Sequence, residues 1–159
     1  MSETKWLDDD QQRQWRAYLR GTRLLEKALA DELTPYKMQL TEYELLSMLS
    51  ESPGQRTRMS RLADDIVQSR SRVTHTASRL EKRGWVERCR STDDGRGVEI
   101  SLTDAGRAVL DELAGVHVDS VRRNLVDVLS PEQFAALGEA MTVLRDRLAP
   151  DHHEIGLDD

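Results

Sequence analysis

Two short helical patterns of hydrophobic residues follow one another in the middle of the chain. The first covers residues 60–67, with Ser60 as its candidate N-cap, and the second covers about residues 70–83. Ser69 suits the N-cap of the second helix because its hydroxyl can accept from a free backbone N–H, and Gly84 suits the left-handed residue that ends a helix. The inward positions are Leu62, Ala63, Ile66, Val73, Ala77 and Leu80. The pattern predicts two helices separated by a tight break.

The period of the hydrophobic positions changes after the second helix. Residues 85–90 and 98–102 alternate between apolar and polar side chains, as strands do, and Val98, Ile100 and Leu102 share one face. The link between the two runs contains an Asp-Gly pair, which favours a hairpin turn. A hairpin directly after two short helices is the plan of a winged helix-turn-helix. We therefore expect a mainly α fold with a small two-stranded β wing.

One further short helix is expected before this pair. Thr41 and Glu44 have the spacing of a capping box, and Leu40 and Leu45 have the spacing of the hydrophobic staple that accompanies it. The helix should run from about residue 42 to residue 50, because a Ser-Pro-Gly sequence follows and stops it.

Longer amphipathic patterns flank this central region, at residues 8–33, 104–129 and 131–148. Their apolar side chains recur at spacings of three and four, and Thr103 and Ser130 are candidate N-caps of the second and third helices. A winged helix of about 60 residues already closes a small core, which leaves these three apolar stripes in need of another surface. A two-fold dimer that exchanges terminal helices would supply that surface.

These patterns organise the chain as a single domain of residues 1–159. Residues 41–102 form the expected winged helix-turn-helix reader, residues 8–33 and 104–148 the dimerisation helices, and residues 150–159 a polar tail. No basic leader is followed by an apolar run, and no run of apolar residues is long enough to cross a membrane, so we expect a cytoplasmic protein.

Charge is distributed unevenly along the chain. The segment from Arg56 to Arg90 has ten Lys or Arg against four Asp or Glu, a net charge of +6, whereas the whole chain has a net charge of -6. This separation of sign favours a polyanion as partner. The side of the second helix that faces away from the apolar stripe carries Ser71, Arg72, His75, Ser78, Arg79 and Lys82. Such a helix can enter the major groove of DNA, although a solvated charged face is the alternative.

Residues 68–106 resemble the MarR family of bacterial transcriptional regulators. The shared features are a Ser-Arg-Ser opening of the second helix at residues 69–71, a Leu-Glu-Lys-Arg-Gly ending at residues 80–84, an Asp-x-Arg wing at residues 94–96 and a Leu-Thr-x-x-Gly exit at residues 102–106. Four matches in this order and at these spacings are much more specific than any one alone. The helical patterns on both sides also fit, so the resemblance covers nearly the whole chain.

The resemblance implies a homodimeric, sequence-specific regulator that binds double-stranded DNA at a palindromic operator. A repressor that a small aromatic or anionic ligand releases is the form that we expect. The implied DNA contacts are Ser69, Arg70, Ser71, Arg72, His75, Thr76, Arg79 and Arg96. Among them, Arg72, His75 and Arg79 are expected to read bases.

Arg96 lies at the tip of the expected wing and would enter a minor groove. The alternatives are a solvated loop arginine or an ion-pair partner of Asp93 or Asp94. For the basic helix as a whole, the alternative is a winged helix that docks on an acidic protein partner.

Relatives in this family commonly bind small aromatic molecules, often anions, between the dimerisation helices and the reader. The candidate lining residues here are Trp15, Tyr18, Arg20, Tyr36 and Met48. Arg16 or Arg20 would be the partner of an anionic ligand. Core packing is the alternative explanation for each aromatic residue.

Other kinds of chemistry have little support in the sequence. There is no Gly-x-Ser-x-Gly, no phosphate loop and no dinucleotide-binding glycine pattern, so we expect neither an enzyme nor a cofactor. The single cysteine, Cys89, stands between Arg88 and Arg90, which would favour its thiolate, so a redox-responsive regulator is a further alternative. His152 and His153 in the polar tail could bind a metal only adventitiously, and no metal site is expected.

Overall fold

The computed structural model describes residues 4–93 and 95–150. The order of its elements is α1 (Asp9–Leu33), a 3-10 turn (Thr34–Tyr36), α2 (Leu40–Glu51), a second 3-10 turn (Pro53–Gln55), β1 (Arg56–Arg58), α3 (Met59–Asp65), α4 (Arg70–Lys82), β2 (Val86–Arg90), β3 (Val98–Leu102), α5 (Asp104–Val121), a π-helical turn (Arg122–Val126) and α6 (Pro131–Leu148). The predicted fold class, a mainly α winged helix-turn-helix with flanking helices, is confirmed.

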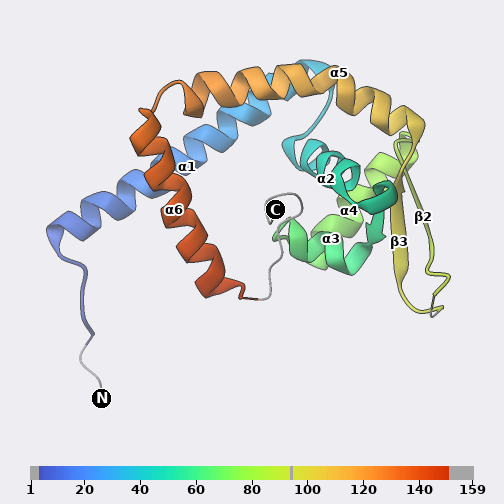
Figure 1. The fold of residues 1–159 in the computed structure, drawn as a ribbon, viewed down its shortest axis with the longest axis horizontal. Coiled ribbons are helices and arrows are strands. Elements are labelled where there is room, and N and C mark those ends of the chain that lie inside the picture. The colour runs from blue at the N-terminus through green and yellow to red at the C-terminus, as the bar shows by residue number, and fades with distance from the viewer. Residues whose placement is uncertain (1–3, 94, 151–159) are drawn as a thin grey trace.

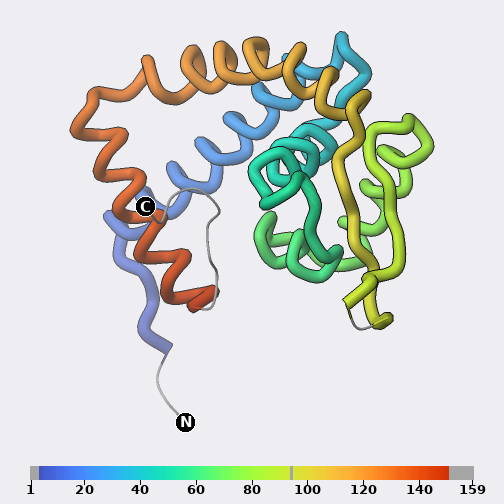
Figure 2. Tube along the Cα trace, turned by 45° about the vertical axis from the view of Figure 1, so that its right-hand side comes forward, coloured from blue at the N-terminus to red at the C-terminus, as the bar shows by residue number. Residues whose placement is uncertain are grey.

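The chain has an arm and a head. Helices α1 and α5 lie side by side and form the arm, and α6 descends from the far end of α5 (Figure 1). The segment from α2 to β3, called the reading head below, lies under the other end of the arm, and Figure 2 shows the same separation after rotation. No helix in the described residues is long and apolar enough to span a bilayer.

One hydrophobic core lies inside the reading head and extends into the arm. Leu45, Leu62, Leu80 and Ile100, from α2, α3, α4 and β3, are all fully buried. The flanking helices also contribute, through Leu33 at the end of α1 and through Leu110 and Leu113 in α5. The head is therefore joined to the arm by shared packing.

The wing has three strands, and the prediction of two was incomplete. Its order is β1-β3-β2, and all neighbours are antiparallel. Strand β1 has the sequence Arg-Thr-Arg and pairs with β3, with Thr57 opposite Ile100. Three residues with no apolar alternation give no strand signal, so this pairing depends on β3, which lies more than forty residues further along the chain.

Two predicted helix caps are wrong. Helix α2 begins at Leu40, one residue before the expected cap Thr41, because the carboxylate of Glu42 accepts a hydrogen bond of 2.9 Å from the backbone N–H of Gln39. Helix α3 begins at Met59, with Arg58 as its N-cap, so Ser60 lies inside the helix. Strand β1 carries the chain in extended form up to Arg58, which leaves no turn for Ser60 to cap.

Three other predicted caps are confirmed. The hydroxyls of Ser69, Thr103 and Ser130 accept from backbone N–H groups three residues further on, at 3.3, 3.1 and 3.2 Å. Gly84 has a φ of 74°, the left-handed value predicted at the end of α4. Helix α5 ends at Val121, earlier than the predicted residue 129, because the chain widens there into the π-helical turn.

Candidate nucleic-acid interface

The N-terminal half of α4 presents a polar and basic surface to solvent. Its predicted residues Ser69, Arg70, Ser71, Arg72 and His75 are all exposed. The Ser69 cap fixes the start of the helix, and α4 is held on its inner side by Val73, Ala77 and Leu80. The structure therefore brings these five predicted residues together on one accessible surface.

Thr76 does not belong to this surface. It is only 3% exposed, so its assignment as a DNA contact is corrected. The reason is helical geometry: Thr76 lies three residues after Val73 and four before Leu80, which places it on the buried stripe of α4.

A cavity of about 230 Å³ separates the start of α4 from the wing. It is lined by Arg58, Met59, Ser60, Arg70, Thr74, Gly97 and Val98. Among the described residues of the lining, two are arginines and two carry hydroxyls, and none carries a carboxylate. Such a donor set suits a phosphate group. The sequence interpretation missed Arg58 and Ser60 because it considered only α4 and the wing tip, although Arg58 belongs to the basic segment.

The wing tip carries Arg96 in an exposed position. The turn is closed by a backbone hydrogen bond of 3.2 Å from the N–H of Ser91 to the carbonyl of Gly97. Asp94, one alternative partner of Arg96, lies outside the described residues.

A side-chain contact joins α4 to the wing. Arg88 on β2 donates to the carboxylate of Glu81 at 2.6 Å and to the hydroxyl of Ser78 at 3.1 Å. The hydrogen bond from Arg88 to the Glu81 carboxylate holds the pKa of Glu81 below its ordinary value. The wing and α4 are thereby linked outside the hydrophobic core.

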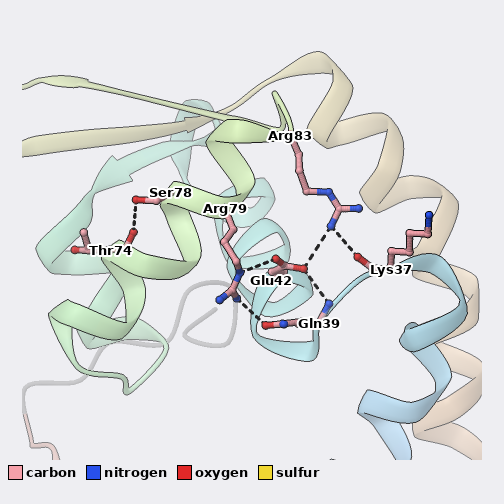
Figure 3. Close-up of polar contacts among 7 residues, drawn as sticks. All are labelled: Lys37, Gln39, Glu42, Thr74, Ser78, Arg79 and Arg83. Carbon is pink, nitrogen blue, oxygen red and sulfur yellow. Dashed lines mark hydrogen bonds and ion pairs between the residues drawn. The ribbon is translucent and has the colours of Figure 1, made fainter.

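Arg79, the third predicted base reader, is engaged inside the protein. Its Nε atom lies 3.0 Å from the carboxylate of Glu42, and its Nη2 atom donates to the side-chain oxygen of Gln39 at 2.7 Å (Figure 3). Both partners belong to the start of α2. The guanidinium group of Arg79 is therefore turned toward α2.

The predicted ligand-binding residues are not brought together. Trp15 and Tyr18 stack on each other on α1, with ring centroids 5.9 Å apart, and both are exposed, as are Arg20 and Tyr36. Of the five, Met48 lines the cavity between α2 and α5. Because Trp15 and Tyr18 lie on the arm, a single chain does not bring all five residues to this cavity, and a pocket completed by a second chain stays a prediction.

The cavity that contains Met48 has a volume of about 300 Å³. Its lining consists of Tyr43, Glu44, Ser47, Met48, Glu51, Ile66 and His117. Burial raises the pKa of Glu44 and lowers the pKa of His117. The ring of His117 lies 4.3 Å from that of Tyr43. The described lining of this cavity combines apolar side chains with two carboxylates and includes no Lys or Arg.

Cys89 is exposed on β2. Among the described residues, no group of three or more His, Cys, Asp or Glu side chains is arranged to hold a metal ion. His152 and His153 lie outside the described residues.

A basic helix exposed beside a three-stranded wing defines a winged-helix DNA-binding protein. Comparison with known proteins agrees: the model of the MarR family matches residues 38–98. The structure superposes on AbsC, a MarR family transcriptional regulator from Streptomyces coelicolor, with a TM-score of 0.87 and 38% identity, covering 93% of this chain and all of AbsC. The chain belongs to the MarR family of transcriptional regulators.

Two further relatives extend this comparison. Sco3205, a MarR family regulator from Streptomyces coelicolor solved in complex with DNA, is 40% identical, with a TM-score of 0.89 and 98% of each chain covered. The transcriptional regulator PecS of Dickeya dadantii is 30% identical over 68% of this chain. That match spans 63% of PecS, less than two thirds of its length.

Proposed function

We propose that this MarR family regulator is a homodimeric repressor that binds a palindromic operator in double-stranded DNA. The observation that carries the proposal is the exposed basic surface of α4, formed by Arg70, Arg72 and His75, with Arg70 facing the wing across the cavity that they share. A recognition helix contacts base edges through its N-terminal residues, and this is the half of α4 that is accessible.

The cavity between α4 and the wing supports the same docking. When α4 lies in a major groove, a backbone phosphate can enter between Arg58 and Arg70 and accept hydrogen bonds from their guanidinium groups. The exposed Arg96 then lies where the wing approaches the neighbouring minor groove.

A second copy of the chain is the proposed partner of the arm. Large apolar side chains are exposed on α1 and α6, at Trp15, Tyr18, Leu24, Phe134, Val143, Leu144 and Leu148. A soluble monomer rarely exposes so many large apolar side chains. Pairing of two arms by a two-fold axis would cover them and present two copies of α4 about one DNA turn apart, ~34 Å.

Release by a small ligand is proposed at the α2–α5 cavity. Tyr43, Met48 and Ile66 give it an apolar wall that suits an aromatic ring. Glu44 and Glu51 disfavour the anionic ligand that the sequence suggested, so a neutral or cationic aromatic compound is the proposed effector. A tenfold loss of operator affinity needs only ~1.4 kcal/mol of coupling between the two sites.

DNA binding and assembly are tested together. Sites are selected from random double-stranded DNA with the full chain, and the affinity and stoichiometry on the selected site are measured by fluorescence anisotropy and sedimentation. The proposal expects a palindromic site occupied by two chains. A protein that remains a folded monomer at micromolar concentration, or that selects no sequence, contradicts it.

The effector is tested by calorimetric titration with simple phenols, aromatic carboxylates and aromatic amines. Ser47→Phe, which places a ring in the cavity, should abolish binding, whereas Trp15→Phe on the arm should not change it. By reciprocity, a true effector binds the operator complex more weakly by the same factor by which it weakens operator binding. Equal affinity with and without DNA would mean that the compound is no effector.

A further inference from the structure

A buried carboxylate lies where the recognition helix meets the start of α2. Glu42 is only 3% exposed, although it is charged and lies in the first turn of its helix. A buried carboxylate is strongly unfavourable unless it is paired and hydrogen-bonded. Glu42 meets both conditions because Arg79 of α4, Arg83 at the C-cap of α4 and one backbone N–H surround it.

The contacts of Glu42 use both of its oxygens. Oε1 accepts from the Nε atom of Arg79 at 3.0 Å, and Oε2 accepts from the backbone N–H of Gln39 at 2.9 Å. The Nη1 atom of Arg83 lies 3.6 Å from Oε2. Figure 3 shows both arginines extending from α4 toward the carboxylate, with Thr74 and Ser78 on another side of the helix.

Arg79 and Arg83 also connect to the segment that leads from the arm into the head. Arg79 donates to the side chain of Gln39 at 2.7 Å, and Arg83 donates to the backbone carbonyl of Lys37 at 2.7 Å. The guanidinium of Arg83 further lies 3.7 Å from the ring centroid of Trp85. The C-terminal half of α4 is therefore attached to residues 37–42, which directly follow the end of α1.

We propose that Glu42 is a positioning residue for DNA recognition: its buried carboxylate holds Arg79 and Arg83, and thereby fixes the recognition helix against the junction between the arm and the head. This inference rests on the proposed DNA-binding function. Arg79 accordingly acts through Glu42 and reads no base. The orientation of α4 in the groove is then set by a side chain that does not touch DNA.

A base-reading role of Arg79 predicts a different effect of Glu42→Gln on operator affinity. If Arg79 read a base, Glu42 would compete with DNA for its guanidinium, and Glu42→Gln would leave operator affinity unchanged or increase it. If Glu42 positions α4, the same substitution releases both arginines and should weaken operator binding about tenfold, while binding to random DNA changes less than about threefold.

The probe is the operator that the unmodified full-length protein selects from random double-stranded DNA, and binding is measured by anisotropy at fixed salt. Asp111→Asn is the matched control, because it also removes one negative charge but lies in an exposed ion pair with Arg107 on α5. It should not weaken operator binding. Equal weakening by both variants, or unchanged or tighter binding of Glu42→Gln, would overturn the proposal. Absence of any selected operator would instead count against the proposed function.

A second set of variants covers the case in which Glu42→Gln does not fold. Arg79→Lys keeps the positive charge but cannot reach both Glu42 and Gln39 as the guanidinium does. It should lower operator affinity with no change in the base preference of newly selected sites. Relaxed preference at one base pair would show that Arg79 is a base reader.

The double variant Glu42→Gln with Arg79→Gln restores a neutral hydrogen-bonding pair. It should bind operator more tightly than Arg79→Gln alone, and failure to do so would also overturn the proposal.

Discussion

Gly106 packs against the backbone carbonyl of Trp85 so closely that any β-carbon at residue 106 would overlap the carbonyl oxygen. The contact lies where β3 passes into α5. Two hydrogen bonds secure the same junction, from the N–H of Thr103 to the carbonyl of Trp85 at 3.1 Å and from the hydroxyl of Thr103 to the carbonyl of Gly84 at 2.7 Å. The glycine of the Leu-Thr-x-x-Gly motif is therefore required by the approach of the arm to the head.

Gly106→Ala should destabilise the protein by about 1–3 kcal/mol, because backbone atoms must move to admit the methyl group. Gly115→Ala is the control in the same helix, where an added β-carbon meets nothing within 4 Å. That substitution should stabilise α5 by about 0.5–1 kcal/mol, since alanine has the higher helix propensity. Urea unfolding of the two variants measures both effects. A neutral Gly106→Ala would contradict the close contact.

The parts of the fold that were predicted from sequence are those set by local chemistry. Ser69, Thr103 and Ser130 cap their helices through a hydroxyl and an N–H three residues apart. Thr41 and Ser60 also carry hydroxyls but lie inside their helices. Strand β1 was missed because its partner β3 is distant in sequence. Glu42 was missed for a similar reason, since only the arginines of α4 account for its burial.

The candidate site was predicted in outline but not side chain by side chain. Thr76 could have been excluded from the sequence, because it lies on the same stripe as Val73 and Leu80. The environment of Arg79 could not have been predicted from the sequence. On a helical wheel Arg79 shares the side of Arg72, and only the position of α2 turns its guanidinium group inward. Trp15 and Tyr18 of α1 were predicted to line a ligand pocket from the chemistry of their rings alone. The side of the arm on which they lie depends on packing between segments, which no local sequence pattern shows.

Arg72→Ala should reduce affinity for the selected operator by about 1–3 kcal/mol and affect random DNA much less. Arg72 is exposed near the start of α4, from which a long side chain can reach base edges. Competition anisotropy with operator and random duplexes measures the two losses. If both duplexes lose affinity equally, Arg72 contacts phosphate only.

Arg58→Ala should weaken binding to operator and random DNA alike, because the cavity that Arg58 lines suits a phosphate and not a base. Loss of one phosphate contact lowers the slope of log affinity against log salt by about 1. Arg107→Ala on α5 removes the same charge from a residue that does not line this cavity and that pairs with Asp111, and it should leave the slope unchanged. A loss confined to operator DNA would instead assign Arg58 to base reading.

The stability of the protein should fall as the pH decreases through the ordinary pKa of histidine, and His117 should cause part of that fall. Burial lowers the pKa of His117 below its ordinary value of 6.5, and its Nδ1 atom is buried without a hydrogen-bond partner. The unfolded chain therefore takes up a proton at this residue before the folded chain does, so unfolding is favoured below pH 6.5 and the neutral form contributes its full stability above it. Glu44 acts in the opposite direction at lower pH, because burial raises its pKa and the folded chain is protonated there first.

His117→Phe keeps a ring beside Tyr43 and removes the titration, so the difference in unfolding free energy between the variant and the unmodified protein should grow in favour of the variant from pH 7.5 to pH 5.5. Urea unfolding at four pH values in this range measures it, and a constant difference would show that His117 is protonated equally in the folded and unfolded states.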